Sequence, residues 1–297
     1  MAQRLLITGV SGFLGRHVAL HLKDQHLVVG TYHEHAVALN GCETRRLDIT
    51  SREHVAALCH AWHPTTIVHT AALGDVEHCE RYPEMAYQVN VQGTANMAQA
   101  ATDIGARLIH ISTDQVYDGT QGHYDETAAP QPLMIYGHTK LAGEQQATAI
   151  CPHTVIVRLA LMYGWGNSMR VTFSDWMLAR LQAGQEVPLF VDQYRTPLYI
   201  EQAAEAIGRL IETPGVQGAF NLGGGERLDR YTFGRIFCEV FNFPQRLLKP
   251  VATATVASTI ARPRDCSLNS AKISALLNIR PLTVGEGLQS MRQDQHI

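Results

Sequence analysis

Residues 4–15 of the chain read Arg-Leu-Leu-Ile-Thr-Gly-Val-Ser-Gly-Phe-Leu-Gly. The apolar run at residues 5–8 is typical of a buried parallel strand, and Leu14, Val18 and Leu22 recur at the spacing of one helical face. Three glycines lie between these two segments. A strand, a glycine-rich turn and a helix in this order are typical of the first unit of a dinucleotide-binding domain.

Each glycine of this turn has a physical role in such a site. Gly9 permits the tight turn, Gly12 lets backbone N–H groups approach a pyrophosphate, and Gly15 lets the helix pack closely on the strand. Three glycines are common in loops, so the inference depends on their position at the first strand-to-helix turn. We therefore expect a dinucleotide to bind here.

The end of the second predicted strand, residues 27–31, bears on the choice of cofactor. Sites selective for NAD(H) place an acid there to hold the ribose 2′-hydroxyl, whereas this chain has Tyr32 and His33, with Glu34 just beyond. Without that carboxylate a 2′-phosphate is not repelled, and Arg16 or His33 could pair with it. The sequence favours NADP(H) over NAD(H), and Glu34 reaching back to the ribose is the alternative.

Strands and helices alternate beyond this unit. Further apolar strands are predicted at residues 44–47, 66–70, 108–111 and 155–157, with helices at residues 52–61 and 83–105 between them. This alternation predicts an α/β fold with a doubly wound parallel sheet and right-handed crossovers. We expect a dinucleotide-binding Rossmann domain from residues 1–164 and 198–224, and a smaller, irregular α/β substrate lobe from residues 165–197 and 225–297.

Small and polar residues follow several of these strands, at the sheet edge where ligands bind in open parallel sheets. Asp48 and Ile49 suit an adenine edge, although Asp48 could equally be the N-cap of the following helix. The residues after the strand at 66–70 are small enough for a nicotinamide ribose to lie against the backbone, with simple packing as the alternative; these are Ala71, Ala72 and Leu73. The next strand delivers Ser112, Thr113 and Asp114 to the same edge.

Tyr136 and Lys140 lie four residues apart in a segment that reads as a helix, residues 135–147. This spacing puts the phenol and the ammonium on one face, with Cβ atoms about 5–6 Å apart. A phenol titrates near pH 10, so it needs a positive neighbour to transfer protons near neutrality. At roughly 4.5 Å and an effective dielectric of about 20, Lys140 would favour the phenolate by about 3.7 kcal/mol. The alternative is a chance pair on a solvated helix.

Composition excludes several classes of function. The 297 residues carry a net charge of -3, which provides no basic field for nucleic acid or membrane. The six cysteines form no Cys-x-x-Cys pattern, no signal peptide precedes the first strand, and no apolar run approaches the length of about 20 residues that spans a bilayer. We therefore expect a reduced, cytoplasmic protein. The histidines lack carboxylates at ligand spacing, so no metal site is expected.

Five motifs span nearly the whole chain. They are residues 8–15 (Thr-Gly-Val-Ser-Gly-Phe-Leu-Gly), 112–119 (Ser-Thr-Asp-Gln-Val-Tyr-Asp-Gly), 136–140 (Tyr-Gly-His-Thr-Lys), 192–197 (Asp-Gln-Tyr-Arg-Thr-Pro) and 262–268 (Arg-Pro-Arg-Asp-Cys-Ser-Leu). In content and order they resemble the extended short-chain dehydrogenase/reductases, and most of all the dTDP-4-dehydrorhamnose reductase branch. Over the same motifs the chain is similar to the β subunit of methionine adenosyltransferase, in which this fold serves a regulatory role.

The resemblance implies roles for individual residues. Tyr136 would be the proton donor, Lys140 would acidify it and hold the nicotinamide ribose, and Thr113 would hydrogen-bond the reacting oxygen. For Thr113, a strand-end hydroxyl that satisfies loop backbone is the alternative. Cofactor contacts are implied at Gly12, Phe13, Leu14, Asp48, Ile49, Ala71 and Ala72.

Gln115 departs from a related pattern. Sugar-nucleotide 4,6-dehydratases resemble this chain here but carry a glutamate that acts as an extra acid and base. An amide cannot shuttle that proton. Dehydratase activity is therefore not expected.

The leading hypothesis is NAD(P)H-dependent reduction of a nucleotide-activated 4-keto-6-deoxy sugar. Arg195, Arg262 and Arg264 lie in motifs that resemble the substrate lobe, and a guanidinium fork suits diphosphate oxygens, with surface solvation as the alternative. Thr113 and Asp114 complete the expected substrate contacts. Two other hypotheses are an epimerase that retains NAD and a non-catalytic regulatory subunit. The expected partner is a nucleotide sugar, with neither nucleic acid nor membrane, and the chain could form a homodimer.

Overall fold

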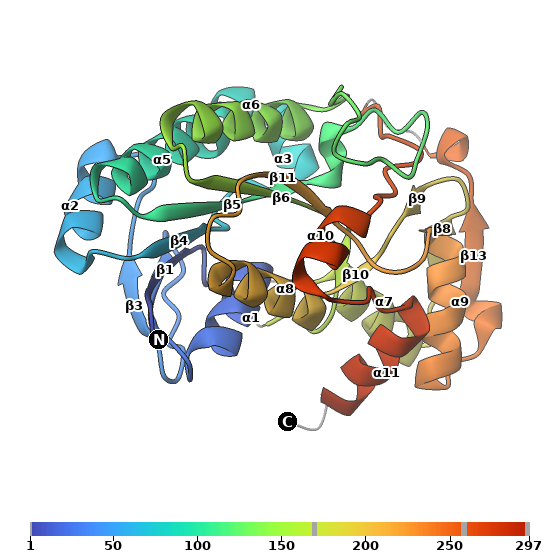
Figure 1. The fold of residues 1–297 in the computed structure, drawn as a ribbon. Coiled ribbons are helices and arrows are strands. Elements are labelled where there is room, and N and C mark those ends of the chain that lie inside the picture. Colours follow the sequence, from blue (N-terminus) through green and yellow to red (C-terminus); the bar gives the residue numbers. More distant parts are fainter. Residues whose placement is uncertain (1, 168–170, 257–259, 295–297) are drawn as a thin grey trace.

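A parallel sheet of seven strands, in the order β11-β6-β5-β4-β1-β2-β3, forms the centre of the molecule (Figure 1). The structure, a computed structural model, describes residues 2–167, 171–256 and 260–294. The strands are β1 (Arg4–Thr8), β2 (Leu27–Tyr32), β3 (Glu43–Arg46), β4 (Thr66–His69), β5 (Arg107–Thr113), β6 (Thr154–Leu159) and β11 (Gly218–Leu222). The predicted doubly wound parallel sheet is confirmed.

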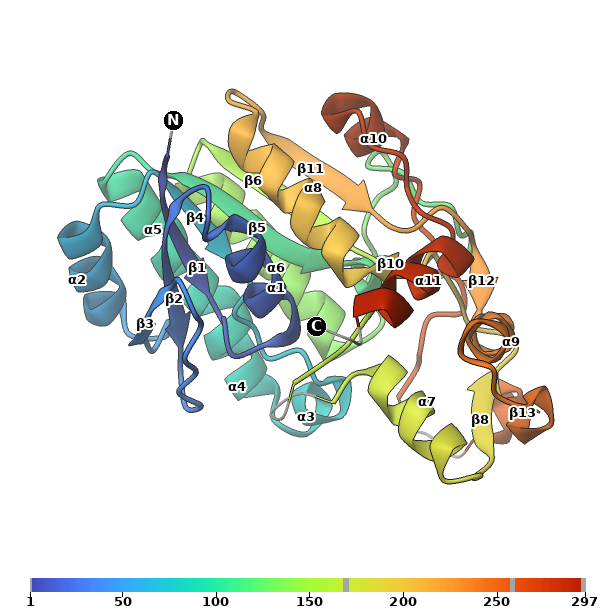
Figure 2. The same cartoon turned by 90° about the horizontal axis from the view of Figure 1, so that it is seen from below.

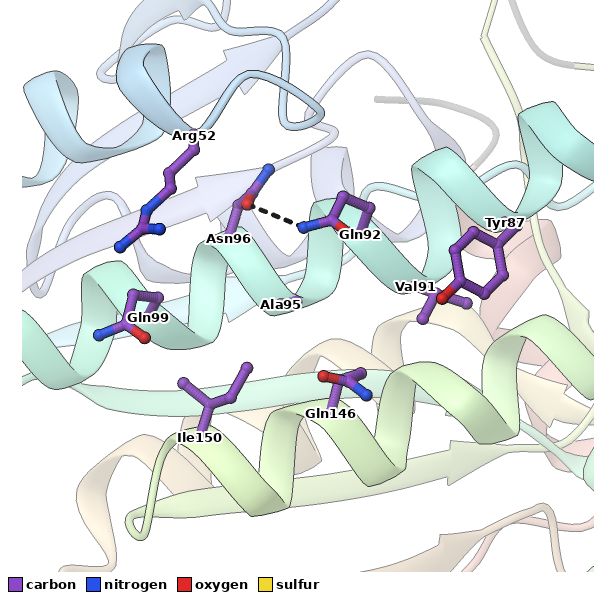
Figure 3. Close-up of a pocket in the computed structure, with 9 residues that line it drawn as sticks. All are labelled: Arg52, Tyr87, Val91, Gln92, Ala95, Asn96, Gln99, Gln146 and Ile150. Carbon is purple, nitrogen blue, oxygen red and sulfur yellow. Dashed lines mark hydrogen bonds between the residues drawn. The ribbon is translucent and has the colours of Figure 1, made fainter.

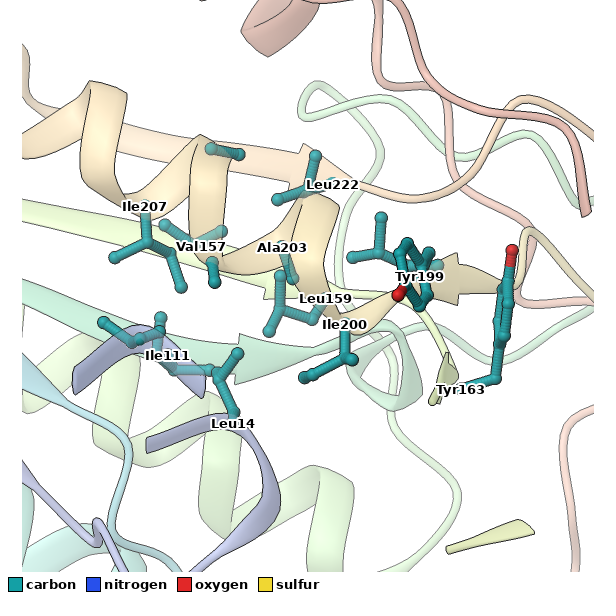
Figure 4. Close-up of a cluster of buried hydrophobic side chains, with 14 of the residues drawn as sticks. Leu14, Ile111, Val157, Leu159, Tyr163, Tyr199, Ile200, Ala203, Ile207 and Leu222 are labelled. Carbon is teal, nitrogen blue, oxygen red and sulfur yellow. The ribbon is translucent and has the colours of Figure 1, made fainter. Parts of the chain in front are cut away.

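Helices cover both faces of this sheet (Figure 1). One face carries α1 (Phe13–Leu22) and α8 (Ile200–Glu212); the other carries α2 (Arg52–Trp62), α5 (Gly93–Asp103) and α6 (Ile135–Ile150). Alternate strand residues face opposite ways, so Leu5 and Ile7 belong to one core and Leu6 to the other. Figure 4 shows part of the first core, where Leu14 and Ile207 pack near Ile111. Each such buried side chain stabilises the fold by about 1.5–3 kcal/mol.

The helix predicted at residues 83–105 contains a π-helical turn. Helix α4 (Pro83–Tyr87) continues through the π turn Gln88–Gln92 into α5. Asn90 in this turn accepts from the backbone N–H of Leu73 and donates to the Leu73 carbonyl and to the Thr139 hydroxyl. The wider turn therefore ties the loop after β4 to α6.

The remaining elements gather beyond the carboxyl ends of β5, β6 and β11 (Figure 2). They include α3 (Val76–Arg81), α7 (Phe173–Gln182), α9 (Arg230–Phe241), α10 (Ala271–Leu277) and α11 (Val284–Asp294). Three two-stranded ladders join β7 (Met162–Tyr163) to β10 (Leu198–Tyr199), β9 (Tyr194–Arg195) to β12 (Leu228–Asp229), and β8 (Val187–Phe190) to β13 (Leu248–Val251). Among the described residues, no helix has both the length and the apolar character needed to cross a bilayer.

A buried ion pair fastens α6 to the sheet. The Glu144 carboxylate on α6 accepts from Arg158 on β6 at 2.7 and 3.0 Å, and from the Ser112 hydroxyl on β5. Arg158 also donates to the Tyr117 phenol at 2.9 Å. Both charged side chains are more than nine-tenths buried, at 7% and 6% exposure, so each depends on the other for its neutralisation.

We expect Arg158→Met to lower the free energy of unfolding by about 3–5 kcal/mol, because the Glu144 carboxylate would be left buried without its counter-ion. The double variant Glu144→Met/Arg158→Met should recover part of that loss. Urea unfolding measures both. Lys249→Met is the control, since Lys249 pairs with Glu186 on the surface and should contribute at most about 1 kcal/mol. Equal effects of Arg158→Met and Lys249→Met would contradict a stabilising role for the buried pair.

Candidate active site

The N-terminus of α1 opens into a cavity of about 460 Å³ at the carboxyl ends of the strands. Gly12 is the N-cap and supplies no side-chain hydrogen bond, so the first N–H groups of α1 stay available to a ligand. A Cβ on Gly15 would lie 2.4 Å from the Gly9 carbonyl oxygen and 2.7 Å from the Thr70 hydroxyl. Gly15 is thus packed closely, as expected, against Gly9 of the turn and Thr70, which directly follows β4. This uncapped N-terminus fits a pyrophosphate.

Many of the predicted site residues share this cavity. Those among its lining residues are Gly12, Phe13, Leu14, Ala72, Thr113, Asp114, Tyr136, Lys140 and Arg195. Arg262 is not among them; its guanidinium pairs with Glu77 on α3. The structure therefore brings the glycine turn, the Tyr136–Lys140 pair and the end of β5 together around one space.

Two contacts position the start of α6, which carries Tyr136. The N-cap residue Met134 offers no side-chain bond, and the Glu80 carboxylate on α3 accepts from the backbone N–H of Ile135 at 2.8 Å instead. A Cβ on Gly137 would lie 2.3 Å from the Gln115 carbonyl oxygen. Glycine at position 137 thus allows α6 to approach the turn after Thr113. The glycine inside Tyr-Gly-His-Thr-Lys was a sequence signal for this close approach, but the sequence-based prediction did not use it.

Lys140 is a buried ammonium next to a histidine. It is 3% exposed, and its Nζ lies 3.5 Å from Nε2 of His110. Burial lowers the pKa of Lys140 to about 8, and the attraction of Glu144 opposes that fall. Because an ammonium only donates, Nε2 of His110 accepts, and the proton is on Nδ1, which has no hydrogen-bond partner among the described residues.

A second buried histidine lies beside this pair. The rings of His69 and His110 are 5.4 Å apart, and His69 contacts the hydroxyls of Thr8 and Thr94. Burial, reinforced by the charge of Lys140, lowers the pKa of His69 to about 3 and that of His110 well below its ordinary value. Both imidazoles are therefore neutral near pH 7.

Thr113 and Asp114 lie at the end of β5 in the same cavity. The Thr113 hydroxyl donates to the Asp114 carboxylate at 3.1 Å and accepts from the backbone N–H of Gln115 at 3.2 Å. The other carboxylate oxygen of Asp114 lies 3.3 Å from Nε of Arg195. Burial raises the pKa of Asp114, and Arg195 opposes that rise. Thr113 thus satisfies loop backbone, as the structural alternative supposed, while still lining the cavity.

Sequence reasoning missed Arg230, the first residue of α9. Its guanidinium lines the cavity and lies 4.8 Å from the centroid of the Phe173 ring. Removal from water, with repulsion from Arg195, lowers the pKa of Arg230 to about 9. No motif pointed to this residue, because it enters the site only through the packing of α9.

The residues predicted for the adenosine end lie at the tips of β2 and β3. His33 and Glu34 are exposed, with the His33 Nδ1 atom 3.8 Å from the Glu34 carboxylate. Arg46, which the sequence reading overlooked, donates to the His33 carbonyl at 3.2 Å and brings a cation to this tip. The parallel pairing of Tyr32 with Arg46 causes this proximity.

The alternative of Asp48 as a helix N-cap is wrong. Ser51 caps α2 by accepting from the backbone N–H of His54. The Asp48 carboxylate instead accepts from the backbone N–H and hydroxyl of Thr50, which lower its pKa. Asn96 donates to the carbonyls of Ile49 and Thr50, so the loop expected to meet adenine is held rigidly.

A second hollow, of about 250 Å³, lies between α5 and α6 near the start of α2 (Figure 3). Amide side chains such as Asn96, Gln99 and Gln146 line it together with Arg52. None of its described lining residues is a carboxylate, imidazole or thiol, so they offer no acid–base pair. In the described part of the chain, no group of three or more His, Cys, Asp or Glu residues is placed to hold a metal ion.

The model of the RmlD substrate binding domain family matches residues 3–297. The chain belongs to this family. As an RmlD-family protein it is 33% identical over 289 residues to the probable low-salt glycan biosynthesis reductase Agl14 of Haloferax volcanii, with 96% of each chain covered. It is 31% identical over 287 residues to the methionine adenosyltransferase 2 subunit beta of Rattus norvegicus, with 93% of this chain and 83% of that protein covered.

The fold of this RmlD-family chain also matches a solved structure. The dTDP-4-dehydrorhamnose reductase of Bacillus anthracis in complex with NADP has a TM-score of 0.88 and 27% identity, covering 99% of this chain and 100% of that one. The resemblance to the dTDP-4-dehydrorhamnose reductases, and to the β subunit of methionine adenosyltransferase, is confirmed.

The burial of Lys140 predicts a pH-dependent stability. Between pH 8 and 10.5 the native state loses the Lys140 proton while the unfolded state keeps it, so unfolding takes up a proton and native stability rises with pH. Relative to Lys140→Met, the wild-type chain should gain about 3 kcal/mol across this window. Urea unfolding of both proteins at several pH values measures the difference, which also cancels other titrating groups. A difference that stays constant with pH would show that Lys140 titrates normally.

Proposed function

We propose that this protein reduces the keto group of a nucleotide-activated 4-keto-6-deoxy sugar with NADP(H), as dTDP-4-dehydrorhamnose reductases do. One observation carries this proposal: Thr113, Tyr136 and Lys140 line the same cavity as the open N-terminus of α1. The names of similar proteins, a glycan biosynthesis reductase and a dTDP-4-dehydrorhamnose reductase, support it.

The chain's own residues have distinct tasks in this reaction. A bound nicotinamide supplies the hydride. The phenol of Tyr136 gives its proton to the oxygen that becomes the alcohol. The Thr113 hydroxyl has a single proton, which in this structure is donated to Asp114; turned to the substrate, it would hydrogen-bond that oxygen as negative charge develops on it. Lys140 uses one N–H on His110, which leaves its other N–H groups for the nicotinamide ribose and the Tyr136 side. Its charge favours the phenolate that remains after proton transfer.

Substrate and cofactor would approach this centre from opposite sides. The N-terminus of α1 and the exit of β4 would hold the dinucleotide, through Gly12, Phe13, Leu14, Ala71 and Ala72. The lobe of residues 165–197 and 225–297 would hold the nucleotide sugar. Phe173 and Arg195 in this lobe line the cavity, which supports that division.

A regulatory function is the second candidate, because the chain is similar over 93% of its length to the methionine adenosyltransferase 2 subunit beta. In that case the cofactor site would serve to shape a surface for a partner enzyme. Turnover of a nucleotide sugar by the purified protein separates this function from catalysis.

Purified protein mixed with NADPH and dTDP-4-dehydrorhamnose should consume the reduced nicotinamide, followed by its absorbance. Tyr136→Phe should lower kcat by about 10²–10⁴, because the phenyl ring has no proton to give. Tyr87→Phe is the control, since Tyr87 lies exposed on α4, away from the cavity. No consumption by the wild-type chain would remove this substrate, and turnover of Tyr136→Phe at the wild-type rate would remove its role as proton donor.

We propose further that Arg46, together with Arg16 and His33, favours NADP(H). Arg46 is exposed at the tip of β3, next to the place where a 2′-phosphate would lie. A guanidinium pairs well with phosphate oxygens. Glu34, which would oppose a phosphate, has its carboxylate 3.8 Å from Nδ1 of His33.

Arg46→Gln should raise KM for NADPH roughly tenfold or more and leave KM for NADH nearly unchanged, since only the former carries the 2′-phosphate. Steady-state kinetics with each cofactor provide the measurement. Arg45→Gln is a matched control, because the neighbouring Arg45 is engaged with Glu43 at 2.6 Å. If Arg46→Gln weakened both cofactors equally, Arg46 would not distinguish between them.

A further inference from the structure

The charges that line the cavity are out of balance. Among the described residues that line the cavity, Asp114 is the only carboxylate, whereas Lys140, Arg195 and Arg230 are cationic. Near the end of β5 the excess is carried by the two arginines, which face a single acid. Lys140 is buried and Arg230 is half-buried. Cations withdrawn from water without a partner destabilise a protein, so an excess of this kind calls for an explanation in terms of a ligand.

Arg195 already has its partners. One of its terminal nitrogens donates to the Tyr194 carbonyl at 2.6 Å, the other donates to the Pro263 carbonyl at 3.2 Å, and Nε lies 3.3 Å from the Asp114 carboxylate. Its side chain and that of Asp114 are 7% and 3% exposed. Arg195 thus offsets the charge of Asp114 and is fixed by backbone carbonyls.

Arg230 is left without an anion. Among the described residues it donates no hydrogen bond and forms no ion pair; its contacts are the face of the Phe173 ring and a longer-range attraction to Asp114. It is also the first residue of α9, where the positive end of the helix dipole disfavours a cation. Neither local helix electrostatics nor a counter-ion in residues 2–167, 171–256 or 260–294 explains an arginine at this position.

We propose that Arg230 binds an oxyanion of the substrate, a phosphate or a carboxylate, at the end of the cavity next to Thr113 and Asp114. The proposal rests on the proposed function only for the statement that substrate enters this cavity. The guanidinium carbon lies over the Phe173 ring, 4.8 Å from its centroid, and the fork of N–H donors suits two oxygens of one anion. Arg195 shields Asp114, which would otherwise repel the anion.

The source of the oxyanion is either the diphosphate of a nucleotide or a carboxylate on the sugar itself. Three probes without a reducible ketone separate these sources: inorganic pyrophosphate, dTDP and D-glucuronate. Each is added without cofactor, at matched ionic strength, to the wild-type chain and to Arg230→Gln. Arg235→Gln is the control, because Arg235 lies on the same helix but is exposed and contacts Gln245.

Thermal unfolding and calorimetric titration read out the result. Without probe, Arg230→Gln should melt no lower than the wild type, since it removes an uncompensated charge. Either pyrophosphate and dTDP, or glucuronate, should raise the melting temperature of the wild type and of Arg235→Gln. The affinity of Arg230→Gln for the same probe should be roughly tenfold to hundredfold lower than that of the wild type. A response to the first two probes assigns the diphosphate, and a response to glucuronate assigns a sugar carboxylate.

Two results would overturn the proposal. One is that no probe stabilises the wild type more than it stabilises Arg230→Gln. The other is that Arg230→Gln lowers the melting temperature and leaves probe affinity unchanged, which is the signature of a packing residue on Phe173. If Arg230→Gln does not fold, Arg230→Lys serves instead, with charge retained but the two-oxygen geometry lost, and an intermediate affinity is expected. Because binding needs no turnover, a protein that binds probes but does not reduce the ketosugar would refute only the proposed function.

Discussion

The Glu144 carboxylate, buried between Arg158 and Ser112, is the interaction on which the site depends. It joins α6 to both β5 and β6, two strands whose carboxyl ends line the cavity. Lys140 lies one helical turn before Glu144, and Tyr136 one turn earlier still. Because a charged pair in the interior tolerates little displacement, the helix cannot slide without exposing or unpairing an ion. The register of Tyr136 and Lys140 against Thr113 follows from that restraint.

The site keeps several charges at the expense of stability. Within the described part of the chain, Lys140 lies beside the neutral His110, one buried oxygen of Asp114 accepts no hydrogen bond, and Arg230 forms no ion pair. Each would be better solvated outside the protein. The hydrophobic cores on both faces of the sheet provide the stability that allows them. Such groups gather where ligands bind, because a ligand can supply the missing partner.

Close approach of backbone segments shapes the cavity as much as its charges do. Gly15 lets α1 lie against the turn and Thr70, and Gly137 lets α6 lie against the Gln115 carbonyl. The π turn around Asn90 adds a third such contact, between the loop after β4 and α6. Elements from three parts of the chain therefore converge within reach of one small ligand, with the open N–H groups of α1 on one side and the arginines of the C-terminal elements on the other.

The sequence by itself determined the sheet, the glycine turn and the placement of Tyr136 and Lys140 one turn apart on a helix, because alternation along a strand and spacing along a helix are local properties. Ser51 was missed as the cap of α2 since two candidate caps stood close together. Only the tertiary structure decided that Arg230 lines the cavity and that Arg46 lies beside His33. It also decided that Arg195 forms an ion pair with Asp114. These contacts join residues from separate elements, and their distances depend on how whole helices and strands pack, which no local pattern encodes.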